Sequence, residues 1–378
     1  MSHKHNPLAQ KRSTDAFPHA YRTQNIVVAA TLPASANTQR FKVPSFNSVV
    51  QSLWVTVDMP ACTQGDYDPS AMLKYVKRVS LRHSTKFFEY EPAKYFPILL
   101  NRDRNNVSKA KKLACFGNRA ASSSAETWLM PILHPFDQWL SKDFYDGDVR
   151  HGARSKGAFR CDLLKEELVV EIELADLADY SDNCIQASAP ANLKLYFTEI
   201  VSPNIEQIKA ALPTSTICNV YTHVQDVAFT TAEQTVKLSG AMARAPTENI
   251  ILLIKDTAGT VAASRDPFSY CPAIDHYKVN CDGRELLNSE ELDTDIVKNY
   301  EDLRNGRTGG RGDPDLPIIS FGPHPYGVAH TSGMLSNTSC NTVEVALKCK
   351  AASSVTFSCE QCQSFAFKNG TIVHANSY

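Results

Sequence analysis

The sequence predicts an all-β chain that folds as two consecutive jelly-roll β-barrels, with short helices in the loops. Segments in which apolar and polar residues alternate recur along the 378 residues, and a period of two marks a strand with one buried and one wet face. Turn-forming residues separate these segments, and the helical patterns are short. About five or six strands can be counted in each half, so two barrels of roughly 175 residues fit better than one.

In the first half, the alternation predicts strands at 25–33, 49–61, 75–83, 167–174 and 192–200. Within 49–61, Leu53, Val55 and Val57 fall on one face and Trp54 falls on the other. Glu171 and Glu173 share the wet face of their strand. Two carboxylates could serve acid–base chemistry, but at this spacing they more often only solubilise an exposed face.

Between these strands, residues 86–100 predict a strand that leads into a helix. Pro97 should limit that helix to about one turn, because proline lacks a backbone N–H. Residues 101–124 are polar and basic. Their charges are not interleaved with aromatic rings, as a nucleic-acid groove would require, so a solvated loop is expected.

The chain is expected to divide into a flexible basic arm (1–24), a first barrel (25–212) and a second barrel (213–378). A short helix marks the boundary, with Ser202 as N-cap and Pro203 at its first position. Strands follow at 216–230, 234–240, 249–256, 341–349, 353–359 and 363–368. Of these, 249–256 is apolar enough to be buried on both faces.

The strongest helical pattern spans 286–303, where Leu292, Ile296, Tyr300 and Leu303 form an apolar stripe. Acidic residues crowd its first turn, where the helix dipole favours them. Asn369-Gly370 is a tight-turn pair between the last strands.

The eleven cysteines are scattered singly. Several, such as Cys349 and Cys359, continue the buried phase of a strand, which favours reduced cysteines that act as small apolar residues. The single CxxC, Cys359 to Cys362, has no second pair to complete a zinc site. Strand or turn cysteines are therefore expected there.

No catalytic, cofactor-binding or metal-ligating residue is predicted, and the chain is expected not to be an enzyme. The common nucleotide, hydrolase and zinc-protease motifs do not occur. A jelly-roll enzyme of the cupin type would need clustered histidines, and those beyond residue 20 stand alone. His3 and His5 form one HxH, within the predicted arm. The net charge of -1, with no apolar run of ~18 residues and no signal-peptide core, predicts a soluble chain that is not secreted.

Several segments occur in the order found in one viral family: Tyr277 to Leu287, Tyr300, Ile319 to Pro325, His330 to Ser339, and Asn369 to Tyr378. Together with Phe41 to Ala61, they resemble the double-jelly-roll major capsid proteins of nucleocytoplasmic large DNA viruses, virophages and Polinton-like viruses. Thr331 stands where the family has proline before the Ser-Gly pair.

This resemblance implies a viral structural protein, made in the host cytoplasm and located in the virion. It implies homotrimers that form pseudo-hexameric capsomers of an icosahedral DNA-virus shell. The implied partners are neighbouring capsomers, minor or cement capsid proteins and a penton protein. The basic arm would face an internal membrane or the genome.

Three alternatives stay open. One is a minor capsid or scaffold protein of the same fold. Another is a receptor- or carbohydrate-binding β-sandwich, for which the outward Trp54 is a candidate; the third is an enzyme on a jelly roll. Arg311-Gly312-Asp313 could reach an integrin-type receptor but is more often an ordinary turn. The acceptor patterns at Asn106, Asn337 and Asn369 are expected to stay unglycosylated.

Overall fold

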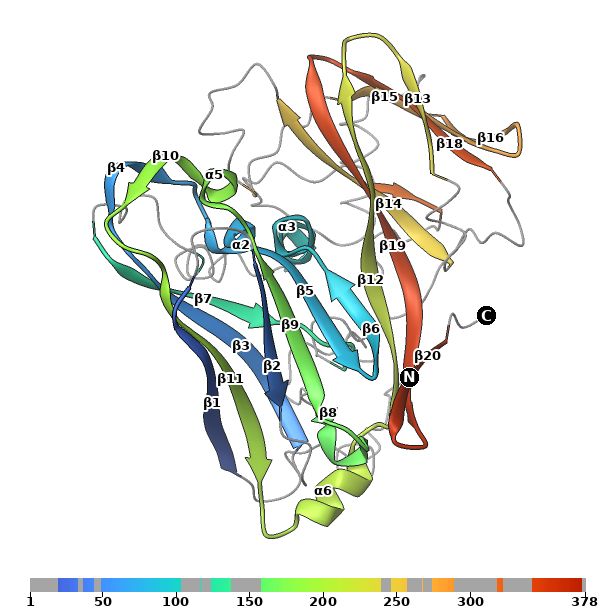
Figure 1. Cartoon of the computed structure of the whole chain (residues 1–378). Helices are drawn as coiled ribbons and strands as arrows, with labels where there is room; N and C mark the ends of the chain where they lie inside the picture. The colour runs from blue at the N-terminus through green and yellow to red at the C-terminus, as the bar shows by residue number, and fades with distance from the viewer. Residues whose placement is uncertain are drawn as a thin grey trace, which may run out of the picture. The chain divides into compact units, whose positions relative to one another are not determined.

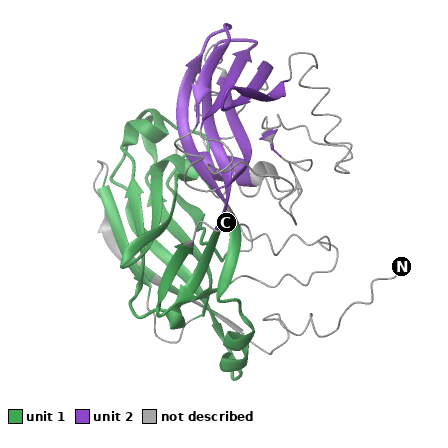
Figure 2. Ribbon diagram, turned by 90° about the vertical axis from the view of Figure 1, so that its right-hand side faces the viewer, with its two compact units in different colours: residues 1–93, 111–218, 364–375 green, residues 94–110, 219–363, 376–378 purple. Residues whose placement is uncertain are grey.

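The computed structural model describes residues 20–32, 37–43, 49–102, 116, 124–136, 158–238, 246–256, 267, 274–288, 318–321 and 342–375. The chain forms two compact units, coloured in Figure 2. Unit 1 comprises residues 1–93, 111–218 and 364–375; unit 2 comprises 94–110, 219–363 and 376–378. The predicted barrel boundary after residue 212 remains a prediction. No helix in the described part of the chain is long and apolar enough to cross a membrane.

Unit 1 is built from two sheets, drawn in Figure 1. One has the order β1-β11-β3-β7, with the short β8 pairing β3, and the other has the order β2-β9-β5-β6. The strands are β1 (Ala20–Thr31), β2 (Asn37–Val43), β3 (Val49–Met59), β5 (Val76–His83), β6 (Thr85–Tyr90), β7 (Glu126–Ile132), β8 (Phe159–Arg160), β9 (Leu168–Leu174) and β11 (Ala191–Val201). A separate two-stranded sheet joins β4 (Cys62–Tyr67) to β10 (Ser181–Gln186).

Short helices connect these strands. They are α2 (Met72–Tyr75), α3 (Pro92–Arg102), the 3-10 turn η5 (Cys161–Leu163), α5 (Leu177–Tyr180) and α6 (Ile205–Ala211).

Unit 2 also contains two sheets, with the orders β12-β19-β14-β17 and β13-β18-β15-β16. The strands are β12 (Ser215–Phe229), β13 (Gln234–Lys237), β14 (Thr247–Asp256), β15 (Ile274–Cys281), β16 (Arg284–Asn288), β17 (Ile318–Ser320), β18 (Val343–Cys349) and β19 (Ser353–Lys368). The end of β19 lies in unit 1, where it pairs with β20 (Thr371–Ala375) through a turn at Asn369 and Gly370. Both turn residues have positive φ (53° and 77°), which confirms the predicted tight turn.

The two units repeat one topology. If the eight principal strands of each series are numbered in chain order, both units have one sheet ordered 1-8-3-6 and a second ordered 2-7-4-5. This pair of antiparallel sheets is a jelly roll. The prediction of an all-β double jelly roll is therefore confirmed.

The cores follow the predicted alternation. Leu53, Val55 and Val57 of β3 are buried, while Trp54 between them is half-buried on the outward face. In unit 2, β14 is buried on both faces as predicted: Ile250 and Leu252 enter the main core, and Ile251 and Leu253 are buried on the opposite side. Each fully buried side chain of this kind contributes about 1.5–3 kcal/mol to stability.

The first strand begins earlier than predicted. Residues 20–24, expected in the flexible arm, belong to β1 and pair with β11 from Ala20↔Val201 to Gln24↔Phe197. Arg22 adds a 2.7 Å ion pair to Glu199. The expectation was wrong because pairing with a strand far along the chain orders this segment, and local polarity does not reveal such pairing. Residues 1–19, with His3 and His5, lie outside the described residues.

Two helices differ from prediction. Helix α3 runs through Pro97 for 11 residues, because Tyr95, Phe96 and Ile98 are buried and this burial outweighs the ~3 kcal/mol cost of an interior proline. Helix α6 has Asn204 as its N-cap instead of Ser202. The Asn204 N–H donates to the Ser202 hydroxyl at 3.1 Å, so that hydroxyl closes a turn just before the helix.

Near the C-terminus, the segments predicted as separate strands at 353–359 and 363–368 form the single strand β19. The intervening residues stay extended because Glu360 and Gln361 pair with Asn249 and Thr247 of β14, across a shift in register. The helix predicted within 286–303 was expected to begin at a cap on Asn288 or Ser289, and Leu286, Leu287 and Asn288 form the end of strand β16 just before it. The rest of that segment lies outside the described residues.

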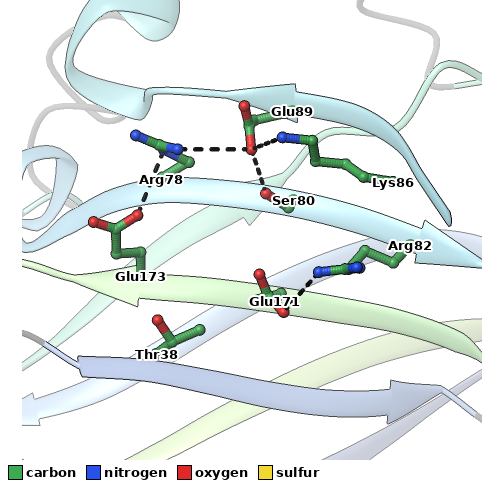
Figure 3. A pocket seen from close by; sticks show the side chains of 8 residues that line it. All are labelled: Thr38, Arg78, Ser80, Arg82, Lys86, Glu89, Glu171 and Glu173. Carbon is green, nitrogen blue, oxygen red and sulfur yellow. Dashed lines mark hydrogen bonds and ion pairs between the residues drawn. The ribbon is translucent and has the colours of Figure 1, made fainter.

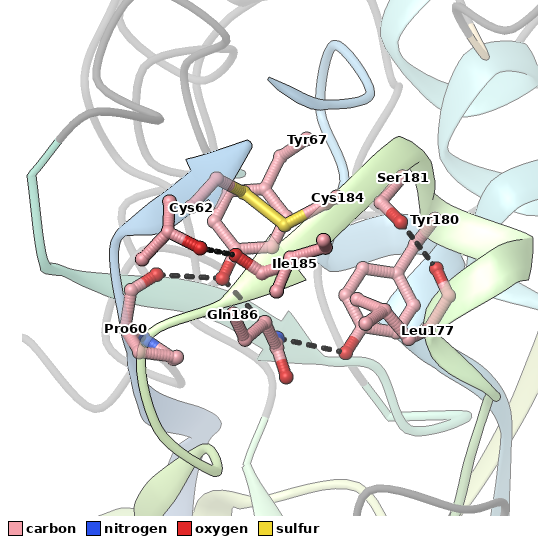
Figure 4. The surroundings of a disulfide bond; sticks show 10 residues. Pro60, Cys62, Tyr67, Leu177, Tyr180, Ser181, Cys184, Ile185 and Gln186 are labelled. Carbon is pink, nitrogen blue, oxygen red and sulfur yellow. Dashed lines mark hydrogen bonds between the residues drawn. A yellow bond between two sulfur atoms is a disulfide. The ribbon is translucent and has the colours of Figure 1, made fainter. Parts of the chain in front are cut away.

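The expectation of reduced cysteines is wrong at one end of unit 1. Cys62 of β4 and Cys184 of β10 form a disulfide (Figure 4), and Cys281 is disulfide-bonded as well. The two cysteines are 122 residues apart, so only the fold could reveal the pair. An intracellular chain rarely keeps such a bond.

Hydrogen bonds and packed aromatic rings support the disulfide. Tyr67 donates its hydroxyl to the Pro60 carbonyl at 2.6 Å, and the Gln186 amide donates to the hydroxyls of Tyr67 and Tyr180 at 3.2 and 3.3 Å. The Tyr67 ring also packs edge-on against Trp128, at a centroid distance of 4.9 Å. The β4–β10 tip is therefore a fixed structure rather than a loose loop.

His134 is a buried titratable group in unit 1. The side chain is 0% exposed. Its ring packs edge-on against Phe159. Burial lowers the pKa of His134 to about 4, and the neighbouring Gln51 backbone offsets only part of this effect.

We expect the double substitution Cys62→Ala, Cys184→Ala to lower the stability of unit 1 by about 2–4 kcal/mol, because the bond closes a very long loop in the unfolded chain. The unfolding temperature should fall by roughly 5–15 °C in scans without reductant. Omitting the reductant leaves the Cys281 bond intact in both proteins. Equal unfolding temperatures would contradict a stabilising role.

His134 should make unit 1 sensitive to acid. Between pH 6.5 and about 4 the unfolded chain binds a proton that the folded chain does not, so stability falls as pH drops through this window. The loss should reach about 3 kcal/mol, at ~1.4 kcal/mol per pH unit. In urea titrations, the free energy of unfolding of His134→Leu should depend less steeply on pH over this range. The control His374→Leu, at an exposed position, should keep most of the pH dependence of the unmodified protein. Parallel curves for His134→Leu and the unmodified protein would refute this role.

Candidate functional site

A polar hollow lies on the outward face of sheet β2-β9-β5-β6 in unit 1. It encloses about 290 Å³ and is lined by Thr38, Arg78, Ser80, Arg82, Lys86, Glu89, Glu171 and Glu173 (Figure 3). Strand register brings these side chains together. Arg40, Glu171, Ser80 and Glu89 follow one another across the four strands.

Glu171 joins three strands of this face. It accepts a 2.7 Å hydrogen bond from Arg40 Nε of β2 and a 3.4 Å hydrogen bond from Arg82 Nη1 of β5. The Glu171 side chain is 19% exposed, whereas Arg40 is 67% exposed. The carboxylate is therefore the fixed member, and the arginines reach it from the solvent side.

Glu89 and Glu173 complete the network. Glu89 accepts 2.7 Å and 2.8 Å hydrogen bonds from Lys86 and Ser80. Partial burial tends to raise the pKa of Glu89, but these two hydrogen bonds and the charges of Lys86 and Arg78 outweigh it and hold the pKa below its usual value. Arg78 Nε also lies 3.5 Å from Glu173.

This arrangement suits cohesion better than catalysis. Each of the three carboxylates in the hollow is paired with a cation of the same sheet, so the charges of the hollow link its strands to one another. The interpretation of Glu171 and Glu173 as merely solubilising is therefore incomplete, because they link neighbouring strands. Alternation could have signalled the outward Arg78 and Arg82, but not which carboxylate each would meet.

The corresponding sheet of unit 2 is also charged on its outward side. His276 Nε2 lies 2.8 Å from Glu233, Lys348 lies 2.8 Å from Asp275, and Lys237 lies 3.2 Å from Glu344. The hydrogen bond from Lys348 lowers the pKa of Asp275. Both units therefore carry ion pairs on the 2-7-4-5 sheet.

The outward face of sheet β1-β11-β3-β7 has a different character. Trp54 stacks on Tyr196, with ring centroids 5.5 Å apart and planes 5° apart. A sugar platform needs free aromatic faces, and this stacking covers one face of each ring. The pair therefore acts as a cross-strand contact, of the kind worth about 0.5–1.5 kcal/mol.

Of the other residues that the sequence analysis singled out, some lie in the part of the chain that the structure describes and some lie outside it. Cys359 and Cys362 are buried in β19, as strand cysteines should be. Burial raises the pKa of Cys359 to about 12 despite a hydrogen bond with Thr247, so the thiol stays protonated and is a poor metal ligand. Asn369 lies in the β19–β20 turn. The Arg311-Gly312-Asp313 triplet, Asn106 and Asn337 lie outside the described residues.

Within the described ranges, no group of three or more His, Cys, Asp or Glu residues could hold a metal ion.

No protein-family model and no curated protein sequence matches the chain. Solved structures do match. VP54 of PBCV-1, fitted into a cryo-EM reconstruction of the virophage Sputnik, has a TM-score of 0.69 at 11% identity and covers 96% of this chain and 98% of its own.

The Faustovirus major capsid protein gives a TM-score of 0.60 at 11% identity and covers 93% and 91% of the two chains. The mavirus major capsid protein gives 0.52 at 10% identity, covering 93% and 90%. At such identities the likeness establishes the fold. The chain has the double jelly-roll fold of viral major capsid proteins.

The substitution Glu171→Gln should lower the free energy of unfolding by about 1 kcal/mol, because it removes the charge that Arg40 and Arg82 share. The loss should shrink in 1 M salt, where the Debye length is about 3 Å. The matched control is Glu167→Gln, since Glu167 makes only an exposed 3.8 Å pair with Lys42. Urea titrations at low and high salt measure both effects. An equal loss in both variants would show that the network has no special role.

Proposed function

We propose that this chain is the major capsid protein of an icosahedral DNA-virus shell, assembled as homotrimers that form pseudo-hexameric capsomers. The repeated 1-8-3-6 and 2-7-4-5 strand order supports this most directly, because one chain supplies two similar barrels. Three copies would present six similar units around a threefold axis. A capsomer of this kind fits a hexagonal lattice although it contains only three copies of the chain.

The physical character of the units agrees with a structural role. Closed pairs of sheets expose few free strand edges, which limits uncontrolled aggregation. The described polar hollow is filled with paired charges instead of reactive groups. We propose accordingly that the chain is not an enzyme.

The proposed partners are neighbouring capsomers, minor or cement proteins and a penton protein, all within the virion. Residues 1–19 carry Lys4, Lys11 and Arg12 against Asp15. This basic segment would face inward, toward an internal membrane or the genome. Synthesis in the host cytoplasm is compatible with the Cys62–Cys184 bond if that bond forms as the particle meets an oxidising medium.

Two alternatives predict different behaviour in solution. A minor capsid protein of the same fold would remain monomeric or would need another partner. A carbohydrate-binding sandwich is disfavoured by the stacking of Trp54 on Tyr196, because one face of each ring is already covered.

Light scattering on the purified full-length chain tests the proposal. A stable species of about three times 41.8 kDa, with a pseudo-hexagonal outline in negative-stain images, is the expected result, since obligate interfaces are large and persist on dilution. A monomer at every accessible concentration would overturn the major-capsid assignment.

A further inference from the structure

The β19–β20 hairpin, residues 364–375, is attached to unit 1 by separate and identifiable contacts. All of these residues belong to unit 1, although β19 begins in unit 2. Among the described strands, β20 pairs with β19 alone. Phe367 of β19 donates its N–H to the Thr214 carbonyl at 2.8 Å. The remaining contacts of the hairpin with unit 1 come from its side chains and its turn.

Three aromatic rings of unit 1, Phe88, Phe136 and Phe159, form an aromatic seat for the hairpin. Phe365 is 0% exposed and packs edge-on against Phe88 of β6, with ring centroids 6.2 Å apart. Phe367 stacks on Phe136 at 4.8 Å and meets Phe159 edge-on at 5.3 Å. Two side chains of β19 therefore anchor the hairpin through ring contacts.

The turn of the hairpin is fixed by the connection that precedes β9. Lys165 donates its N–H to the Gly370 carbonyl at 3.0 Å. The next residue, Glu166, donates its N–H to Nε2 of His83 at 3.2 Å. The Glu166 carboxylate accepts a 2.7 Å hydrogen bond from the Ser84 hydroxyl. The connection therefore joins the turn of the hairpin to the end of β5.

The contact between His83 and Glu166 exists only while the histidine ring is neutral. A backbone N–H can only donate, so Nε2 carries no proton and the proton of the neutral ring lies on Nδ1. His83 is 5% exposed, and Nδ1 is buried without a hydrogen-bond partner among the described residues. A second proton would set the Nε2–H group against the Glu166 N–H group and would bury a charge. Protonation of His83 is therefore incompatible with this contact.

The charges around His83 offer little compensation for a proton on its ring. The surrounding elements carry both ion pairs and single charges: Arg82–Glu171, Lys86–Glu89, Lys42–Glu167, Lys165, Glu166 and Lys368. The Glu166 carboxylate already accepts the hydrogen bond from Ser84, and no carboxylate of the described residues forms an ion pair with His83. A charged ring would thus keep its burial cost unless the contact opened.

Two further histidines adjoin the side-chain contacts of the hairpin. His134 is 0% exposed and packs edge-on against Phe159, the ring that Phe367 meets. Burial lowers the pKa of His134 to about 4. His374 of β20 stacks on Phe365 at 4.8 Å, and its partial burial lowers its pKa as well. Acid therefore acts on the ring contacts of the hairpin in the same direction as on its turn.

We propose that the β19–β20 hairpin is released by acid: protonation of His83 breaks its contact with Glu166, and residues 364–375 then leave the aromatic seat while the rest of unit 1 stays folded. The released form binds a proton that the docked form excludes. Docking is therefore complete above the ordinary titration range of histidine, near pH ~6.5, and is lost as the pH falls below it. This inference goes beyond the proposed function and holds whether or not copies associate.

Hydrogen exchange measured by mass spectrometry tests the release on the full-length chain. Peptides that cover the hairpin are compared at about pH 7 and about pH 5, with the intrinsic pH dependence of exchange subtracted. We expect their protection to fall about tenfold more than the protection of β11 peptides, which report on unit 1 as a whole. An equal change in both regions, or no change in either, would overturn the proposal.

Two substitutions separate the proton of His83 from its shape. In His83→Gln the side-chain carbonyl can accept the Glu166 N–H at every pH, so the hairpin should keep most of its protection in acid. In His83→Asn the shorter amide does not reach that N–H, so protection should be reduced to a similar extent at both pH values. A loss in acid as large as that of the unmodified chain, in either variant, would show that His83 does not control the release. If His83→Gln does not fold, His83→Asn decides this point.

His276→Gln is the matched control, because it removes a histidine of unit 2 and should leave the acid response of the hairpin unchanged. A reduced response in this variant would contradict the assignment to His83. The outcome is independent of the light-scattering test. A chain that is always monomeric ends the proposed capsid function and leaves acid release intact, whereas a stable trimer whose hairpin stays protected in acid overturns only this inference.

Discussion

Each unit depends on the insertion of its last principal strand between the first and the third. In unit 1, β11 pairs with β1 on one side and β3 on the other, and β19 holds the equivalent place in unit 2. Without this strand the larger sheet would separate into two pieces, each with new unpaired edges. Because Ala20 must meet Val201, the sheet is complete only when distant parts of the chain have come together, which makes such topologies slow to fold.

That topology gives each barrel two outward faces, and the two faces carry different kinds of side chain. On unit 1 the 2-7-4-5 sheet carries ion pairs centred on Glu171, Glu89 and Glu173. The 1-8-3-6 sheet carries the stacked Trp54 and Tyr196, with Lys194 as a charged neighbour in the next row. Paired surface charges add little stability but keep a face hydrated and soluble. The two outward faces of unit 1 therefore differ in chemistry, because ion pairs link the strands of one and an aromatic stack links strands of the other.

Two further features concern stability and not recognition. The Cys62–Cys184 bond restricts the unfolded chain, and the buried His134 disfavours the charged state that acid would impose. Both lie in unit 1. The bond favours the folded state of unit 1, whereas the buried histidine disfavours that state in acid.

The sequence by itself determined the fold class, most strand positions and the buried phase of strands such as β3 and β18. A period of two is a local signal that each strand carries whatever its partner is. The sequence also showed that the common catalytic motifs do not occur and that capsid-like segments follow one another in the order of the family. Only the tertiary structure decided which residues meet: Cys62 with Cys184, Glu171 with Arg40 and Arg82, and residues 20–24 with β11. It also decided that burial would carry α3 through Pro97. These outcomes depend on contacts between residues far apart in the chain, and local pattern contains no information about the partner.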